Sequence, residues 1–240
     1  MLGYIELSAI LPATTPAAVK SELQQQVAVF QQQLTDLLAT ADLAAPALQQ
    51  RLQWQYQVPE LGEGGACSLF GQLAAQPYDL TAILSGQTPA NQHLLAQLAL
   101  VTEFYQQQSQ SDWFGIYQRR VNPQGDTVLV KLSYFGAPSR AEFPLTTEFA
   151  AISNNVTVGL SGKARIINDV PAYLATGGEY YTCDPKVLAE ACIPLFDAGG
   201  QVTGIIDSEA FAKDLFNGQE LALLIATALV VPTLWTPAQD

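Results

Sequence analysis

CIPLFDAGGQVTGIIDSE, residues 192–209, joins two apolar runs through a short glycine-containing break. Apolar runs of this length, separated by Ala198-Gly199-Gly200, are typical of a β-hairpin. We therefore predict strands over 192–197 and 201–209 that pair antiparallel. This hairpin sets the fold class, because its neighbours must extend or cover an antiparallel sheet.

A second hairpin is predicted upstream. Residues 113–120 (WFGIYQRR) and 126–136 (DTVLVKLSYFG) are strand-like, and Asn122-Pro123-Gln124-Gly125 between them is a turn signal. Residues 148–170 contain a short helical pattern and then a strand, and residues 217–234 form a closing helix. This order of elements predicts an α+β fold, with helices packed on one face of an antiparallel sheet.

The part of the chain before residue 88 has a different composition, rich in Gln and with helical periodicity. Thr15-Pro16 resembles an N-cap followed by Pro at the first helical position. A second helix is plausible over 47–57, and residues 58–71 are turn-rich because four glycines break the periodicity. We predict a helical, Gln-rich extension over 1–87 and a sheet-containing domain over 88–240.

Charge and cysteine content exclude several classes of function. A net charge of −12 makes phosphate backbones and anionic lipid poor partners, so we expect no nucleic acid and no membrane. The start, MLGYIELSAI, lacks the basic residues and long apolar stretch of a signal peptide, and the longest apolar run, 221–231, is too short to span a bilayer. Three cysteines without framework spacing indicate a reducing compartment, so we expect a cytoplasmic protein.

Metal chemistry lacks the necessary residues. The chain has a single histidine, His93, and no Cys-x-x-Cys, so zinc sites and histidine-based triads are not expected. We expect no metal and no cofactor. Gln-rich helices on a protein of low charge content can associate, and on that ground we predict a homodimer.

A thiol and a carboxylate lie close together in EYYTCDPKVLAEACIPLFD, residues 179–197. Cys183 is followed directly by Asp184, and Glu190 comes seven residues later. In one interpretation Cys183 lies in a loop by chance and Cys192 packs in the strand that follows. In the other, Cys183 is a nucleophile and Glu190 supplies or orients a proton.

Two more acids and two aromatic residues extend the second interpretation. Asp207 and Glu209, two apart in a predicted strand, point to the same face. Carboxylates crowded into an apolar pocket raise one another's pKa, so one of them can stay protonated near neutral pH. Trp113 and Tyr117 also share a strand face and can enclose a methyl group. Each pair alone is more often packing or solvated surface, and the prediction rests on their joint occurrence.

These residues together resemble a known family. LSGKARIINDV and IPLFDAGGQVTGIID, with the order of elements, resemble a GAF domain, and residues 95–235 resemble the GAF-type reductases of free methionine-(R)-sulfoxide. In that family a Trp and a Tyr lie four apart in the first strand, a Cys-Asp pair is followed seven residues after the cysteine by Glu, and a later strand ends in two acids. The matching residues are Trp113, Tyr117, Cys183, Asp184, Glu190, Asp207 and Glu209, and the spacing from Cys183 to Pro194-Leu195 also matches.

The resemblance implies a reductase of free L-methionine-(R)-sulfoxide that is recycled by a thiol reductant, thioredoxin or a small thiol. The implied catalytic residues are Cys183, Glu190 and Asp207, with Glu190 or Asp207 as proton donor. The implied substrate-binding residues are Trp113, Tyr117, Asp184 and Glu209, with Glu209 helping to hold the substrate's ammonium group.

The chain also departs from the family. Glu209 stands where the family usually has Asp. Residues 151–159 correspond to the segment that holds the family's resolving cysteine, but they contain no cysteine. The first 90 residues match nothing in the family. Recycling is therefore left open between Cys192, Cys67 and an external small thiol, of which we favour the last. The alternative functions are a non-catalytic GAF-type small-ligand sensor and a helical interaction protein with a degenerate GAF core; a pigment-binding domain is less favoured, because no His lies near Cys183 in the sequence.

Overall fold

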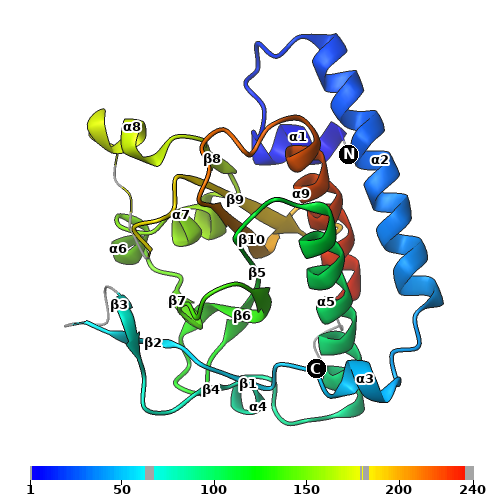
Figure 1. Ribbon diagram of the computed structural model, residues 1–240, viewed down its shortest axis with the longest axis vertical. Helices are drawn as coiled ribbons and strands as arrows, with labels where there is room; N and C mark the ends of the chain where they lie inside the picture. The colour runs from blue at the N-terminus through cyan, green and yellow to red at the C-terminus, as the bar shows by residue number, and fades with distance from the viewer. Residues whose placement is uncertain (1, 63–67, 179, 181–183, 236–240) are drawn as a thin grey trace.

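The computed structural model describes residues 2–62, 68–178, 180 and 184–235. Within these residues the centre of the molecule is a six-stranded sheet in the order β7-β6-β5-β10-β9-β8, with every neighbouring pair antiparallel (Figure 1). The strands are β5 (Trp113–Val121), β6 (Thr127–Phe135), β7 (Glu142–Pro144), β8 (Arg165–Ile167), β9 (Ala189–Phe196) and β10 (Val202–Ala210). Both predicted hairpins, β5–β6 and β9–β10, are confirmed, and so is the α+β fold.

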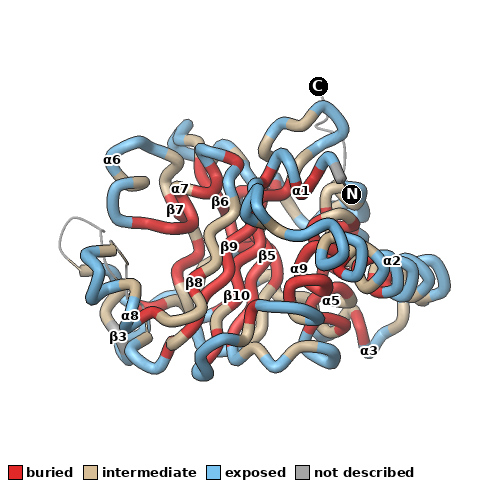
Figure 2. Tube along the Cα trace, turned by 90° about the horizontal axis from the view of Figure 1, so that it is seen from above, coloured by how far each residue is buried: buried red, intermediate tan, exposed pale blue. Residues whose placement is uncertain are grey.

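Helices cover both faces of this sheet, as Figure 2 shows: α5 and α9 lie on one face and α7 on the other. The expectation of helices on one face only is wrong, because the segment after β7 folds back so that α7 contacts β9 and β10. No helix of the described chain is long and apolar enough to cross a bilayer. The helices are α1 (Leu2–Ser8), α2 (Ala17–Thr40), α3 (Pro46–Gln49), α4 (Leu80–Ile83), α5 (Pro89–Gln108), α6 (Thr147–Ala150), α7 (Asn154–Ser161), α8 (Val170–Ala175) and α9 (Gly218–Val230), with a 3-10 turn η2 (Val231–Leu234).

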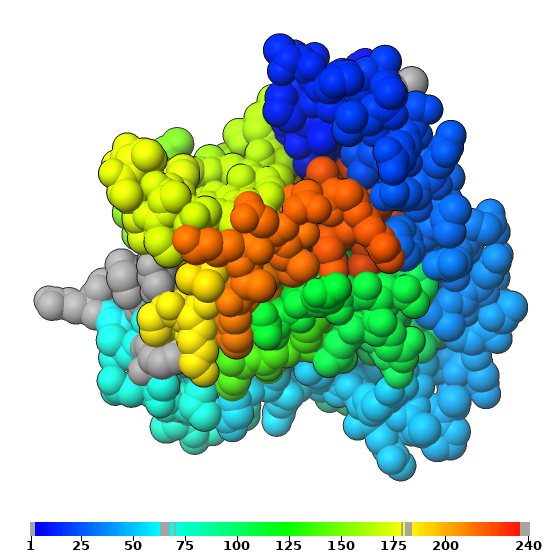
Figure 3. Space-filling view, turned by 45° about the horizontal axis from the view of Figure 1, so that its top comes forward, coloured from blue at the N-terminus to red at the C-terminus, as the bar shows by residue number. Residues whose placement is uncertain are grey.

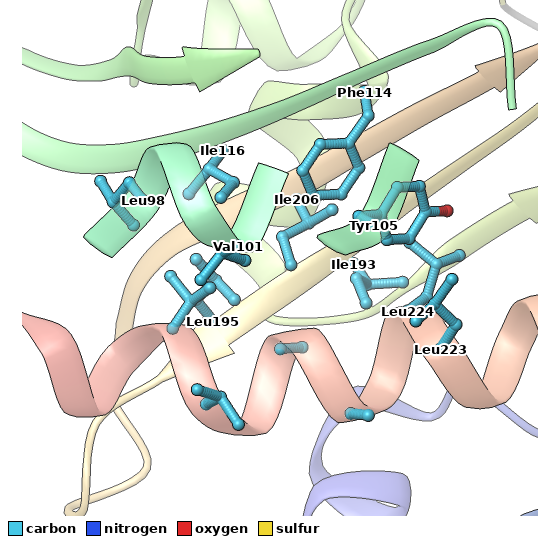
Figure 4. Packing of buried hydrophobic residues seen from close by; sticks show 14 of the residues in the cluster. Leu98, Val101, Tyr105, Phe114, Ile116, Ile193, Leu195, Ile206, Leu223 and Leu224 are labelled. Carbon is cyan, nitrogen blue, oxygen red and sulfur yellow. The ribbon is translucent and has the colours of Figure 1, made fainter. Parts of the chain in front are cut away.

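Alternation along the strands divides the sheet into an apolar face and a mixed face. On the apolar face, Phe114 and Ile116 of β5 and Ile206 of β10 pack with side chains of α5 and α9 in one large core (Figure 4). On the opposite face, Trp113 and Tyr117 belong to a smaller cluster that lies against α7. Successive strand residues point to opposite faces, so Asp207 and Glu209 of β10, which alternate with Ile206, project to the side of the sheet where α7 lies.

The segment before residue 88 is not only helical. The long helix α2 begins one residue later than predicted, because Pro16 itself occupies the N-cap position and Thr15 lies outside the helix. The helix expected over 47–57 is reduced to α3, and two strand pairs follow it, β1 with β4 and β2 with β3. These strands are β1 (Gln55–Tyr56), β2 (Pro59–Leu61), β3 (Ser68–Leu73) and β4 (Tyr78–Asp79).

This segment shares a hydrophobic core with the sheet. α2 runs beside α9 (Figure 1), and its buried side chains belong to the same cluster as those of α5, α9 and the apolar face of the sheet. These side chains are Leu23, Val27, Phe30 and Leu34. Burial of this kind ties the extension to the sheet. The division at residue 87 and the homodimer stay predictions.

Gly204 allows β5 and β10 to approach closely. A β-carbon on Gly204 would lie 2.1 Å from the carbonyl oxygen of Tyr117, which belongs to the backbone of the neighbouring strand and has little room to move. Gly204→Ala is therefore expected to lower the free energy of unfolding by about 2–3 kcal/mol, measured by chemical denaturation. Gly3→Ala is the matched control, since nothing lies within 4 Å of its added methyl group. Equal stabilities for the two variants would contradict this account.

Candidate active site

Three acidic side chains gather on the mixed face at the end of the β9–β10 hairpin. Glu190 of β9 lies directly opposite Glu209 of β10, and Asp207 lies opposite Cys192. Because residues two apart on a strand share a face, these acids project to the same side, away from the main core. Glu190 and Asp207 are buried, at 5% and 4% exposed, and Glu209 is partly buried. The structure thus brings together the three carboxyls that the sequence predicted to converge.

The start of α7 supplies hydrogen bonds to two of these acids. Ser153 is the N-cap residue, and its Oγ accepts a hydrogen bond from the Val156 amide at 3.3 Å. This cap fixes the first turn, where Asn154 and Asn155 are both buried. Asn154 Nδ2 donates to Glu190 Oε1 at 3.0 Å, and Asn155 Nδ2 donates to Asp207 Oδ2 at 2.9 Å.

A small hollow lies between the acids and α7. It has a volume of about 20 Å³ and is bordered by the three acids together with Phe143, Ser153, Asn154 and Asn155. A space of this size accommodates about one water molecule. Two buried side-chain oxygens of these residues, Asn154 Oδ1 and Asp207 Oδ1, have no hydrogen-bond partner within the part of the chain that the structure describes. Most buried polar atoms are satisfied, so these two oxygens mark a place suited to a polar group.

The surroundings raise the pKa of Asp207 and Glu209 well above the ordinary range of carboxyls. Burial is the largest cause for both. The charge of Glu190 adds to the shift of Asp207, and the charges of Asp207 and then Glu190 add to that of Glu209. Lys131 acts in the opposite direction on both. The cluster therefore holds protons more tightly than exposed carboxyls do.

Glu190 is the member most easily ionised. Burial raises its pKa too, but hydrogen bonds from Tyr180 and Asn154 and the charge of Arg165 lower it. The hydroxyl of Tyr180 donates to this carboxyl, and burial followed by the charges of Glu190 and Glu209 raises the pKa of Tyr180, so the tyrosine remains a donor. We therefore assign the negative charge of the cluster to Glu190 and a proton to the carboxyl of Asp207.

Lys131 places a positive charge beneath the cluster. It is a fully buried residue of β6, its Nζ donates to the carbonyl oxygen of Ser139 at 2.9 Å, and it lies 3.9 Å from the centroid of the Tyr134 ring. The rings of Tyr56 and Trp113 lie 5.0 and 5.6 Å from the same nitrogen. Aromatic rings and a carbonyl oxygen are favourable neighbours for a buried ammonium group. This charge limits how far the pKa values of the acids can rise.

The predicted aromatic pair lies on the same face of the sheet as the three acids, with Trp113 opposite Glu209. Trp113 and Tyr117 are 5% and 1% exposed, and their ring centroids lie 6.5 Å apart. Trp113 Nε1 donates to the carbonyl of Ala137 at 2.9 Å, and the Tyr117 hydroxyl donates to that of Arg140 at 3.3 Å. Both rings are therefore fixed by the loop after β6.

A larger cavity of about 360 Å³ adjoins the hollow. Glu209 borders both spaces, and Trp113 and Asp184 line the larger one. Asp184 Oδ1 accepts a hydrogen bond from the amide of Lys186 at 2.9 Å. Three of the four predicted substrate-binding residues therefore face one substrate-sized cavity, and the fourth, Tyr117, is buried beside it.

Of the three cysteines, the structure describes one. Cys183 and Cys67 lie outside the described residues. Cys192, which the structure does describe, is fully buried on the mixed face, in the small cluster with Tyr117 and Ile205. Burial is the main cause of a raised pKa for the Cys192 thiol, and the charges of Asp207 and Glu190 add to it. A protonated thiol without solvent access is a packing residue.

Several residues of this site were not predicted from the sequence. Asn154 and Asn155 were considered only as part of a short helical pattern that lacks the expected cysteine, and Lys131 was taken as part of an ordinary strand. A signal for each exists: two asparagines follow the Ser153 cap just before an apolar helix, and Lys131 is the only charged residue in VLVKLSY. Within the described residues, no cluster of three or more His, Cys, Asp or Glu side chains is arranged to hold a metal ion.

Solved structures share this arrangement of elements. The chain is similar to the type II free methionine-R-sulfoxide reductase from Thermoplasma acidophilum, at 18% identity over 60% of this chain and 94% of that chain, with a TM-score of 0.51. The chain has the GAF fold. At this identity the similarity to the reductase shows the fold alone.

Other solved structures are similar at lower TM-scores. A GAF domain structure matches at 17% identity over 64% of this chain and 81% of that chain, with a TM-score of 0.48. A free methionine-R-sulfoxide reductase from Neisseria meningitidis, solved with its substrate, matches at 18% identity over 65% of this chain and 83% of that chain, with a TM-score of 0.45. No protein-family model and no curated protein matches the sequence.

Proposed function

We propose that this GAF-fold chain reduces free L-methionine-(R)-sulfoxide, with Cys183 as the nucleophile and Asp207 as the proton donor. The observation that carries the proposal is the buried carboxyl cluster, in which the pKa of Asp207 is raised by burial and by the charge of Glu190. A sulfoxide oxygen becomes more basic as its sulfur is attacked, so it needs a neutral acid beside it. A buried carboxyl that stays protonated at neutral pH meets this need.

Hydrogen bonding favours Asp207 over Glu190 as the proton donor. The amide of Asn155 already donates to Oδ2 of Asp207, so the carboxyl proton belongs on Oδ1. Among the residues that the structure describes, that oxygen has no hydrogen-bond partner, and Asp207 borders the hollow. Glu190 instead receives donors from Asn154 and Tyr180, which stabilise its ionised form. Glu190 is assigned the role of raising the pKa of Asp207.

The proposed reaction balances with one thiol and one sulfoxide. The Cys183 thiolate attacks the sulfoxide sulfur, the oxygen takes the proton of Asp207, and the hydroxyl passes to the cysteine sulfur. Methionine leaves as the thioether, reduced by two electrons, and Cys183 is left as a sulfenic acid, oxidised by two electrons. Asp207 regains its proton from water. Trp113 encloses the methyl group, and Asp184 and Glu209 accept the substrate's ammonium group.

We assign the reduction of the Cys183 sulfenic acid to an external thiol. Cys192 is fully buried, and its pKa is raised by burial, so it is poorly suited to attack the sulfenic acid. One small thiol forms a mixed disulfide with Cys183 and releases water, and a second releases the Cys183 thiol with an external disulfide. A reducing cytoplasm supplies such thiols.

The proposal is tested by steady-state turnover with three substrates and an excess of small thiol as reductant. Free (R)-sulfoxide is expected to be reduced, and free (S)-sulfoxide and peptide-bound methionine sulfoxide at least 100-fold more slowly. The matched reductant comparison uses thioredoxin with its reductase and NADPH. Folded protein that reduces none of the three substrates with either reductant would refute the proposal.

A non-catalytic ligand sensor is the second candidate function. The burial of Cys192 favours it, because the thiol that the structure describes cannot take part in recycling. A sensor keeps its ligand affinity when Cys183 is replaced by alanine, and its wild type binds ligand without turnover. Calorimetry combined with the turnover measurement separates the two functions.

A further inference from the structure

The cavity of about 360 Å³ lies between two parts of the chain that are far apart in the sequence. One side is built by Trp113, Arg140, Asp184 and Glu209. The other side is built by the β2–β3 hairpin of the N-terminal segment, which contributes Pro59, Ser68, Gly71, Gln72 and Leu73. In the space-filling view the cyan surface of this segment lies close to yellow surface from the later part of the chain (Figure 3).

Strand pairing and two tyrosines fix the hairpin in this position. β2 and β3 pair antiparallel, with Pro59 opposite Leu73, and the Ala74 amide donates to the carbonyl of Val58 at 2.9 Å. The buried Tyr56 donates from its hydroxyl to the carbonyl of Lys131 at 2.6 Å. Tyr78, which lies opposite Tyr56 in the β1–β4 pair, donates from its hydroxyl to Glu142 of β7. The two tyrosines thus hold the base of the hairpin to the central sheet.

The lining of the cavity matches a small zwitterion with an apolar side chain. Acidic side chains come from Asp184 and Glu209, and cationic groups come from Arg140 and Lys186. Apolar surface is provided by Trp113 and Phe211 on one side and by Pro59 and Leu73 of the hairpin on the other. The volume falls within the range of about 300–1,000 Å³ that is typical of small-molecule pockets.

We propose that the β2–β3 hairpin is the second wall of the amino-acid site, and that Leu73 restricts this site to free amino acids. The inference rests on the proposed function for the identity of the substrate and adds a specificity-determining role for the N-terminal segment. A free amino acid carries both charged groups that the cavity can pair. A peptide-linked residue has lost both charges and carries chain on both sides, which the hairpin leaves no room for.

Leu73→Trp tests the wall directly, with Leu61→Trp as the matched control. Leu73 and Leu61 are both on the hairpin and both partly exposed, at 52% and 44%, but Leu61 does not line this cavity. Binding of L-methionine, the unreactive product, is measured by calorimetry on the full-length protein. Leu73→Trp is expected to weaken binding at least tenfold, and Leu61→Trp is expected to change it less than twofold. Melting temperatures show whether each variant is folded.

The outcomes separate this inference from the reductase proposal. Unchanged affinity in folded Leu73→Trp overturns the hairpin wall and leaves the reductase proposal intact. If the wild type fails to bind L-methionine but binds another of the twenty free amino acids, and Leu73→Trp weakens that binding, the wall stands and the methionine substrate is refuted. If no free amino acid binds the wild type, the inference is overturned.

Leu73→Ala adds a gain-of-function test. This variant is expected to bind N-acetyl-L-methionine methylamide, a model of a peptide-linked residue. If it does not, the proposal that Leu73 limits the size of the ligand is refuted.

Discussion

Replacing Cys183 with serine is expected to reduce turnover of free methionine-(R)-sulfoxide to the background rate, a loss of at least 1,000-fold. A serine hydroxyl is a far weaker nucleophile than a thiolate toward sulfoxide sulfur, and no neighbouring base of the described site is free to activate it. The measurement is single-turnover formation of methionine with no reductant present. That readout isolates the attack of Cys183 from every later step.

The matched control is Cys192→Ala. Cys192 is fully buried and packs in the small cluster on the mixed face, so removing its sulfur costs stability but leaves the chemistry intact. Single-turnover methionine formation should stay within about threefold of wild type. If Cys183→Ser still forms one equivalent of methionine while Cys192→Ala forms none, the nucleophile has been assigned to the wrong thiol. Loss of thioredoxin-linked recycling alone in Cys192→Ala would instead contradict the external-thiol step.

The position of the carboxyl cluster follows largely from the local rules of strand geometry. The alternation of strand residues placed Asp207 and Glu209 on one face, and the hairpin then brought Glu190 opposite Glu209. These are short-range relations, fixed by strand period and turn position. For this reason the sheet, both hairpins and the meeting of the three acids were predictable.

Other parts of the site depend on contacts between distant segments. Asn154 reaches the acids only because α7 folds back across the sheet. Lys131 acts on Asp207 and Glu209 through its charge from β6, which lies two strands from β10. Nothing in their local sequence encodes these partners. The β2–β3 strands were missed for a different reason: residues 58–71 are glycine-rich and lack a clear alternation of polar and apolar residues, so packing against the sheet decides their conformation.

Asp207→Asn is expected to lower kcat for the (R)-sulfoxide by about 100- to 10,000-fold, the usual effect of removing a general acid. Asparagine has nearly the same shape as a protonated carboxyl and still donates a hydrogen bond, but it cannot transfer a proton. Affinity for the product methionine should therefore change little. Asp197→Asn, an exposed site in the turn of the same hairpin, is the control and should keep the wild-type kcat. A larger loss in Glu190→Gln than in Asp207→Asn would move the proton donor to Glu190.

Asp207→Asn is expected to lower kcat but to change the stability of the folded chain in the favourable direction as the pH rises. Burial and the charge of Glu190 raise the pKa of Asp207 above its unfolded value, so the folded chain holds this proton more tightly than the unfolded chain. The stability contributed by this group is complete below the unfolded pKa of about 4 and is lost as the pH rises through the folded pKa. Asparagine does not ionise, so it removes this dependence.

Between pH 4 and pH 8 the free energy of unfolding of wild type, relative to Asp207→Asn, is therefore expected to fall as the pH rises. Urea denaturation at several pH values measures this difference. A gain in stability at pH 8 together with a loss of kcat is the signature of a carboxyl held protonated for chemistry, because a structural carboxylate would lose stability on conversion to the amide. A difference that does not vary with pH would mean that Asp207 has an ordinary pKa, and the proton donor would have to be another group.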